Sequence, residues 1–168
     1  DTGVVAVMFT TTANRAILPN SYASQRRIGW VRRGTATNLQ FTQVGDYFTL
    51  TTQINDVSAA LTLTATAVTL TVPPSTVARF RATGQGPASG TDHMLVFSEI
   101  VEGSVTPSIN TGIASLAIDS NAGVAAGHFE LRVNSSSQIE HDADDVADAP
   151  EFDISTFGWI DARGKLAA

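Results

Sequence analysis

The feature that most constrains the fold of this chain is a series of short stretches in which apolar and polar residues alternate. In residues 77–83, Ala78, Phe80 and Ala82 alternate with arginines, and residues 127–133 show a similar pattern. Side chains two residues apart lie on the same face of a β-strand, so each stretch predicts a strand with one buried face. No segment shows sustained helical periodicity. The chain is therefore expected to be all-β, an antiparallel, jelly-roll-like β-sandwich of about ten short strands.

Other strands are predicted from related patterns. Residues 61–72 give the clearest signal, but their apolar positions change parity at Ala67 and Val68, so we expect a bulge or turn there. Residues 94–101 are apolar on both faces, which indicates a central strand. Turns are expected at Gly45-Asp46 and at residues 134–137. The remaining strands are expected at residues 4–9, 26–33, 39–43, 47–52, 115–118 and 154–161.

Length and composition indicate a single domain with an extensive interface. A chain of 168 residues can form one sizeable core, so residues 1–168 are expected to be one β-sandwich domain, a fragment of a longer protein. Charged residues make up 15% of the chain, against about a quarter in typical globular proteins. Such a surface suits a protein that packs against copies of itself or against neighbours. A monomer with a surface rich in Ser and Thr is the alternative.

Composition also argues against several classes of protein. The chain has no cysteine, hence no disulfide framework, thiolate nucleophile or zinc ribbon. No run of eighteen apolar residues and no signal peptide is present, so membrane insertion is not expected. Residues 1–81 hold seven arginines and three aspartates, whereas residues 82–168 hold three basic and thirteen acidic residues. An acidic chain with a single lysine is a poor match for nucleic acid, and charge pairing between the two halves or between subunits fits better.

The richest polar cluster lies at residues 140–145, within the acidic segment 140–153. Its carboxylates could hold calcium, but it lacks the glycine and the regular oxygen spacing of calcium loops, so we interpret it as an acidic loop between strands. The residues Asp119, Asn121 and Gly123 carry only a fragment of a calcium loop and predict a plain turn. No metal site and no cofactor is expected.

No catalytic residues are predicted. His128, Glu130 and Arg132 share one strand face, but no nucleophile is placed beside them by spacing, so we expect them to pair across strands on a solvated face. Four aromatic residues could stack on sugars, although the core or an interface is the preferred interpretation for the two tryptophans: Tyr22, Trp30, Tyr47 and Trp159.

Two segments carry a resemblance to a known group of proteins. The first contains Leu18-Pro19, Tyr22, Arg26-Arg27-Ile28-Gly29 and Phe41-x-Gln43-x-Gly45-Asp46-x-Phe48, and the second is Phe157-Gly158-Trp159-Ile160-Asp161-x-Arg163-Gly164. In this order they resemble a pattern in virion proteins of tailed bacteriophages, of the tail-fibre or tail-associated type. The middle of the chain matches only in its strand rhythm.

The resemblance implies a non-enzymatic virion domain of a tail fibre, located in the phage tail. Implied partners are sister chains in a homotrimer, other virion proteins, and a glycan or protein of the bacterial surface. The resemblance supplies no catalytic residues. Two alternatives stay open, a capsid decoration or baseplate protein and a polysaccharide-degrading or esterase module. A structural role for Arg26 and Arg27, pairing with carboxylates of the acidic half, is a further hypothesis.

Overall fold

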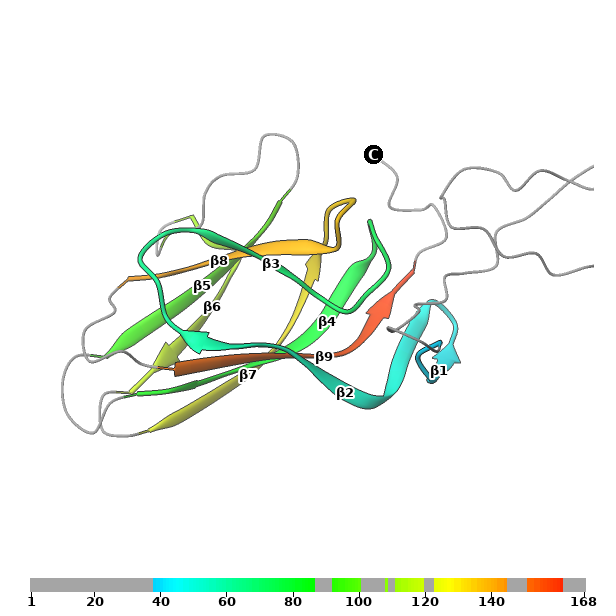
Figure 1. Ribbon diagram of the computed structural model, residues 1–168, viewed down its shortest axis with the longest axis horizontal. Coiled ribbons are helices and arrows are strands. Elements are labelled where there is room, and N and C mark those ends of the chain that lie inside the picture. Colours follow the sequence, from blue (N-terminus) through cyan, green and yellow to red (C-terminus); the bar gives the residue numbers. More distant parts are fainter. Residues whose placement is uncertain are drawn as a thin grey trace, which may run out of the picture.

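Two stacked antiparallel sheets form the body of the protein (Figure 1). The computed structural model describes residues 38–86, 92–100, 108, 111–119, 123–144 and 151–161. The five-stranded sheet has the order β1-β2-β9-β4-β7 and the four-stranded sheet the order β3-β8-β5-β6. The strands within the described ranges are β1 (Phe41–Val44), β2 (Tyr47–Ala60), β3 (Thr66–Thr69), β4 (Val77–Gln85), β5 (His93–Glu99), β6 (Ala114–Ile118), β7 (Val124–Arg132), β8 (Gln138–Ala143) and β9 (Glu151–Ile160).

The pairing of these strands is nested. β2 pairs with β9, β3 with β8, β4 with β7 and β5 with β6, so the chain resembles one long hairpin wrapped into two layers. This arrangement is that of an eight-stranded jelly roll, to which β1 adds an edge strand. The predicted all-β, jelly-roll-like sandwich is confirmed.

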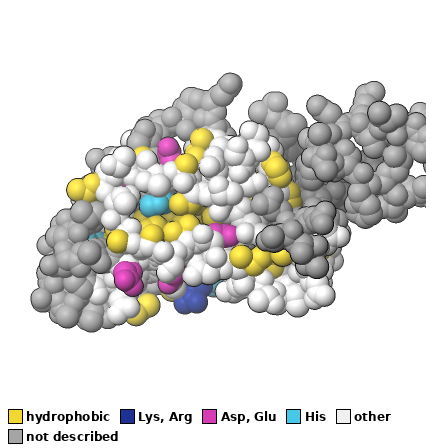
Figure 2. Space-filling model, viewed as in Figure 1, with side chains coloured by type: hydrophobic (Ala, Val, Ile, Leu, Met, Phe, Trp, Pro, Cys, Tyr) yellow, Lys and Arg dark blue, Asp and Glu magenta, His cyan; other side chains and the backbone are white. Residues whose placement is uncertain are grey.

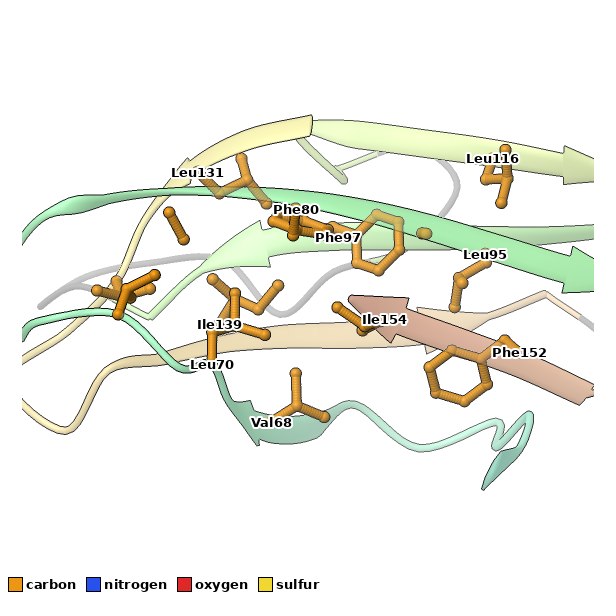
Figure 3. Close-up of a cluster of buried hydrophobic side chains, with 14 of the residues drawn as sticks. Val68, Leu70, Phe80, Leu95, Phe97, Leu116, Leu131, Ile139, Phe152 and Ile154 are labelled. Carbon is orange, nitrogen blue, oxygen red and sulfur yellow. The ribbon is translucent and has the colours of Figure 1, made fainter. Parts of the chain in front are cut away.

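The core lies between the two sheets and is built from aliphatic and aromatic side chains of both. Phe80 of β4 and Phe97 of β5 meet across the layers with ring centroids 5.4 Å apart, and Phe129 of β7 packs against both. Figure 3 shows the rings of Phe80 and Phe97 among aliphatic side chains from both sheets. In Figure 2 hydrophobic side chains form a band across this face, and most of the described surface around the band is white, the colour of the other side chains and the backbone. Tight packing of both inner faces is what joins the layers.

Several strand predictions are confirmed in detail. Ala78, Phe80 and Ala82 of β4 are fully buried, with Arg79 and Arg81 on the opposite face. β5 is an internal strand, as its two apolar faces indicated. Both predicted turns are present: Gly45 has a φ of 62°, which glycine adopts readily, and the Asn134 side chain accepts hydrogen bonds from the amides of Ser136 and Gln138.

The predicted break at Ala67-Val68 is wrong. Both residues lie within β3, opposite Glu140 and Ile139 of β8. The chain instead leaves the strand at residues 61–65, between β2 and β3. There the hydroxyls of Thr62 and Thr66 both donate to the carbonyl oxygen of Thr64, at 3.1 and 2.8 Å. Threonine hydroxyls that bond nearby backbone in this way stabilise a turn instead of a ladder.

One strand is longer than predicted, and another lies where a loop was expected. β2 continues to Ala60. Residues 53–60 show no clear alternation in the sequence, because two register shifts interrupt the pairing of β2 with β9. β8 occupies part of the segment interpreted as an acidic loop. The predicted strands at residues 4–9 and 26–33 lie outside the described residues. Within the described ranges, no helix is long and apolar enough to cross a membrane.

His141 of β8 is a basic side chain inside this core. It is 3% exposed, and its ring lies 4.8 Å from that of Phe152. Its Nδ1 atom has no hydrogen bond among the described residues. Burial lowers the pKa of His141 from its ordinary value of 6.5, and the neighbouring Asp142 carboxylate partly offsets this effect.

Stability is therefore expected to fall on mild acidification. Between its lowered folded pKa and 6.5, His141 binds a proton in the unfolded chain more readily than in the folded one. Its contribution is thus complete above pH 6.5 and is lost as pH falls, by at most about 1.4 kcal/mol per pH unit. Urea denaturation at a series of pH values measures the free energy of unfolding.

The matched control is the same substitution at the exposed His128. We expect His141→Leu to reduce the loss of stability between about pH 7.5 and 5.5, and His128→Leu to leave it in place. Equal pH profiles for the wild type and His141→Leu would show that another group causes the effect.

Candidate binding site

A β-bulge in β9 places two aromatic side chains, Phe157 and Trp159, on opposite faces of the five-stranded sheet. In the register with β4, Gly158 lies opposite Arg79 and Thr156 opposite Phe80, so Phe157 has no partner on β4. Before the bulge Phe152, Ile154 and Thr156 are buried, and after it Trp159 is buried. An inserted residue changes which side chains face the core. Phe157 lies half-buried on the outside, as Asp153 and Ser155 do, and the bulge after it turns Trp159 inward.

The same place is irregular in the pairing with β2. Four residues of β2 lie between Thr49, which pairs with Gly158, and Ile54, which pairs with Thr156. At Gly158 the two backbones approach so closely that an added Cβ would lie 2.1 Å from the carbonyl oxygen of Phe48. The excess chain of β2 brings Gln53 to the side of Phe157.

These irregularities accompany a hollow of about 490 Å³ that is open to solvent. Its lining comes from four adjacent strands, β2, β9, β4 and β7. The residues are Gln53, Arg79, His128, Phe129, Glu130 and Phe157.

Arg79 is the central polar side chain of the hollow. Its Nε donates to Oε1 of Glu130 at 3.1 Å, and its Nη1 donates to the hydroxyl of Thr49 at 3.4 Å. The guanidinium carbon also lies 4.9 Å from the ring centre of Phe157 and 5.3 Å from that of Tyr47. Two hydrogen bonds and two cation–π contacts hold the group in one orientation. Nη2 makes no hydrogen bond to any residue that the structure describes.

The predicted cross-strand pairing of His128, Glu130 and Arg132 is confirmed in part. Glu130 lies directly opposite Arg79 in the β4–β7 register and forms an ion pair with it. His128 contacts the edge of the Phe157 ring, with ring centres 5.3 Å apart. Arg132 does not line the hollow, and its backbone N–H donates to Glu99.

The interpretation of residues 140–145 as a loop is wrong for residues 140–143. Glu140, His141 and Asp142 belong to β8, where His141 points into the core. Alternating burial, with His141 between two acidic residues, made a half-buried strand look like a solvated run. Asp144 accepts a hydrogen bond from the backbone N–H of Met94, and Asp145 lies outside the described residues. The described part of the chain contains no group of three or more acidic or histidine side chains placed to hold a metal ion.

The aromatic residues considered as sugar-stacking groups divide between core and surface. Trp159 is fully buried, as preferred from the sequence, whereas Tyr47 is 49% exposed beside Arg79. Tyr22, Trp30 and the pair Arg26-Arg27 lie outside the described residues, as does Asn121. Phe157, Arg79 and Gln53 were missed as site residues. The glycine that follows Phe157 in a strand was a usable signal, since such glycines often mark bulges.

The described residues of the two segments quoted for the resemblance, 41–48 and 157–161, lie together at one end of the sandwich. The hairpin of β1 and β2 lies against the end of β9, with the Phe48 and Trp159 rings stacked at 5.0 Å and 10°. Phe41 contacts Trp159 edge-on at 5.4 Å. The backbone N–H of Asp161 donates to the carbonyl oxygen of Asp46 at 2.9 Å. The described parts of both segments therefore form one packed unit, which we call the hairpin–β9 unit (residues 41–48 and 157–161).

Comparison with known proteins does not assign the chain to a family. No family model matches it, and no match was found among curated proteins.

Proposed function

We propose that the chain is a structural β-sandwich domain of a phage tail fibre that takes part in fibre assembly and in attachment to the bacterial surface. It acts by binding and catalyses no reaction. The observation that carries the proposal is the hairpin–β9 unit. Residues that resemble tail-associated proteins at two distant places in the chain pack against each other, as expected of a pattern that encodes one structural unit.

The fold supports this proposal by analogy. Jelly rolls recur in viral capsid proteins and in lectins, that is, in proteins that build particles or bind surface sugars. A fold alone does not determine function, so the argument for attachment depends on the hollow around Arg79. Its lining combines an aromatic ring with hydrogen-bonding side chains on a solvent-exposed sheet face, an arrangement suited to recognition.

The proposal includes a homotrimer and contacts with other virion proteins. The weakly charged chain and its uneven charge distribution favour contacts between subunits. Among the described residues, exposed large apolar side chains that could enter such contacts include Val44 and Tyr47 in the hairpin, Ile113 just before β6, and Val124 at the start of β7.

Location in the particle tests the proposal. Antibodies raised against the purified chain are applied to tailed particles isolated from the source culture and viewed by electron microscopy after gold labelling. We expect label at the distal tail and the chain's peptides in mass spectra of the particles. Label on the capsid or baseplate would favour the structural alternative, and absence of the chain from the particles would contradict both.

A further inference from the structure

We propose that the hollow around Arg79 binds a neutral sugar, with the sugar ring against Phe157 and its hydroxyl groups on the surrounding polar side chains. This inference rests on the attachment role proposed above and names the class of ligand that the attachment uses.

The first argument is the outward position of an aromatic ring among polar side chains of β4 and β9. Along β4 the outward side chains include Arg79, Arg81, Thr83 and Gln85, and along β9 they include Asp153 and Ser155. Phe157 continues the outward alternation of Asp153 and Ser155, and the bulge leaves it without a partner on β4. Bulges are common next to functional sites. The C–H face of a sugar ring is an apolar surface that can pack on such a ring.

The second argument is the mixture of hydrogen-bonding groups. Arg79 offers donors, the exposed Glu130 carboxylate offers acceptors, and the Gln53 amide offers both. A sugar hydroxyl both donates and accepts, so it can use all three. The charges of Arg79 and Glu130 offset each other, which removes any strong preference for a charged ligand. The ligand that fits is therefore polyhydroxylated and neutral.

The third argument is preorganisation. Arg79 is already held by Glu130 and Thr49 and lies over the rings of Phe157 and Tyr47. A side chain fixed before binding loses less conformational entropy when the ligand arrives. The volume of about 490 Å³ lies within the range of about 300–1,000 Å³ typical of small-ligand sites.

Titration by NMR tests the assignment. The ¹⁵N-labelled full chain is titrated with the methyl glycosides of glucose, galactose and N-acetylglucosamine and, separately, with glucuronate. We expect at least one neutral glycoside to shift the amide signals of Gln53, Arg79, His128 and Phe157 in a saturable way. Shifts at none of these amides, shifts only elsewhere, or binding of glucuronate alone would overturn the assignment.

A pair of matched glutamine variants separates the hollow from the rest of the sheet. Gln53→Ala removes an exposed lining residue, and Gln85→Ala removes an exposed residue on the outer face of β4 that does not line the hollow. We expect Gln53→Ala to weaken the glycoside by about threefold to tenfold and Phe157→Ser by about tenfold, with Gln85→Ala unchanged. Equal affinities for the wild type and Gln53→Ala would contradict the site.

The outcome is distinguishable from that of the particle experiment. A chain found in the tail whose hollow ignores the sugars would refute the ligand and leave the fibre assignment in place. Sugar binding by a chain that is absent from the particles would refute the fibre assignment and leave the ligand in place. If the same amides respond to the concentration of the protein and not to sugar, the hollow is an interface between copies and the sugar assignment fails.

Discussion

Replacing Gly158 with alanine is expected to destabilise the protein by about 3 kcal/mol. The added Cβ would lie 2.1 Å from the carbonyl oxygen of Phe48 and 3.2 Å from the Cα of Thr49. Both are backbone atoms, so relief requires β2 and β9 to separate where Gly158 pairs with Thr49. The displacement would also disturb the stacking of Phe48 on Trp159, the adjacent pair in the register. Urea denaturation followed by far-UV circular dichroism measures the change.

Gly45→Ala is the control for this substitution. Gly45 has a φ of 62° in the hairpin turn, but nothing lies within 4 Å of its added Cβ. It is therefore expected to lose only about 1 kcal/mol, from the strain of a left-handed backbone. Similar losses for the two variants would mean that steric contact with β2 is not what requires glycine at Gly158.

Trp159→Ala is expected to lower the free energy of unfolding by about 3–5 kcal/mol. The indole is fully buried, stacked on Phe48 and touched edge-on by Phe41. Its removal leaves a cavity among side chains that are held by three neighbouring strands, β1, β2 and β9. Trp159→Phe keeps a ring against Phe48 and is expected to lose about 1–2 kcal/mol.

The matched aromatic control lies on the same strand as Phe48. Tyr47 projects to the opposite face of β2, is 49% exposed and contacts Arg79. Tyr47→Ala is expected to lose about 1 kcal/mol, the value of an exposed cation–π contact. If Trp159→Ala lost no more than Tyr47→Ala, the aromatic cluster would not be the core of the hairpin–β9 unit.

The fold was predictable where burial is one-sided and the pairing regular. Ala78, Phe80 and Ala82 alternate with arginines because β4 lies between β7 and β9 and pairs with β7 without a register shift. The failures fall where side chains of threonine or charged residues hide the strand pattern. In residues 61–65 threonine hydroxyls stabilise a turn inside an apparently continuous strand, and in β8 a buried histidine lies within an acidic run.

The site was less predictable than the fold because it depends on register. Its residues come from four strands, and neither the pairing of Arg79 with Glu130 nor the position of Gln53 beside Phe157 follows from local sequence. His128 and Glu130 were placed on a solvated strand face from their alternation alone. That Phe157 faces outward while Trp159 two residues later faces inward required knowledge of the bulge, for which Gly158 was the local signal.

A double-mutant cycle between Phe48 and Trp159 tests most directly whether the two segments form one unit. Phe48→Leu, Trp159→Leu and the double variant are compared by urea denaturation, and Phe48→Leu is also combined with Ile118→Val, which lies on β6 in the other sheet. We expect a coupling energy of about 0.5–1.5 kcal/mol for Phe48 and Trp159, and additivity within about 0.5 kcal/mol for Phe48 and Ile118. Additive effects at Phe48 and Trp159 would contradict the hairpin–β9 unit and remove the main support for the fibre proposal.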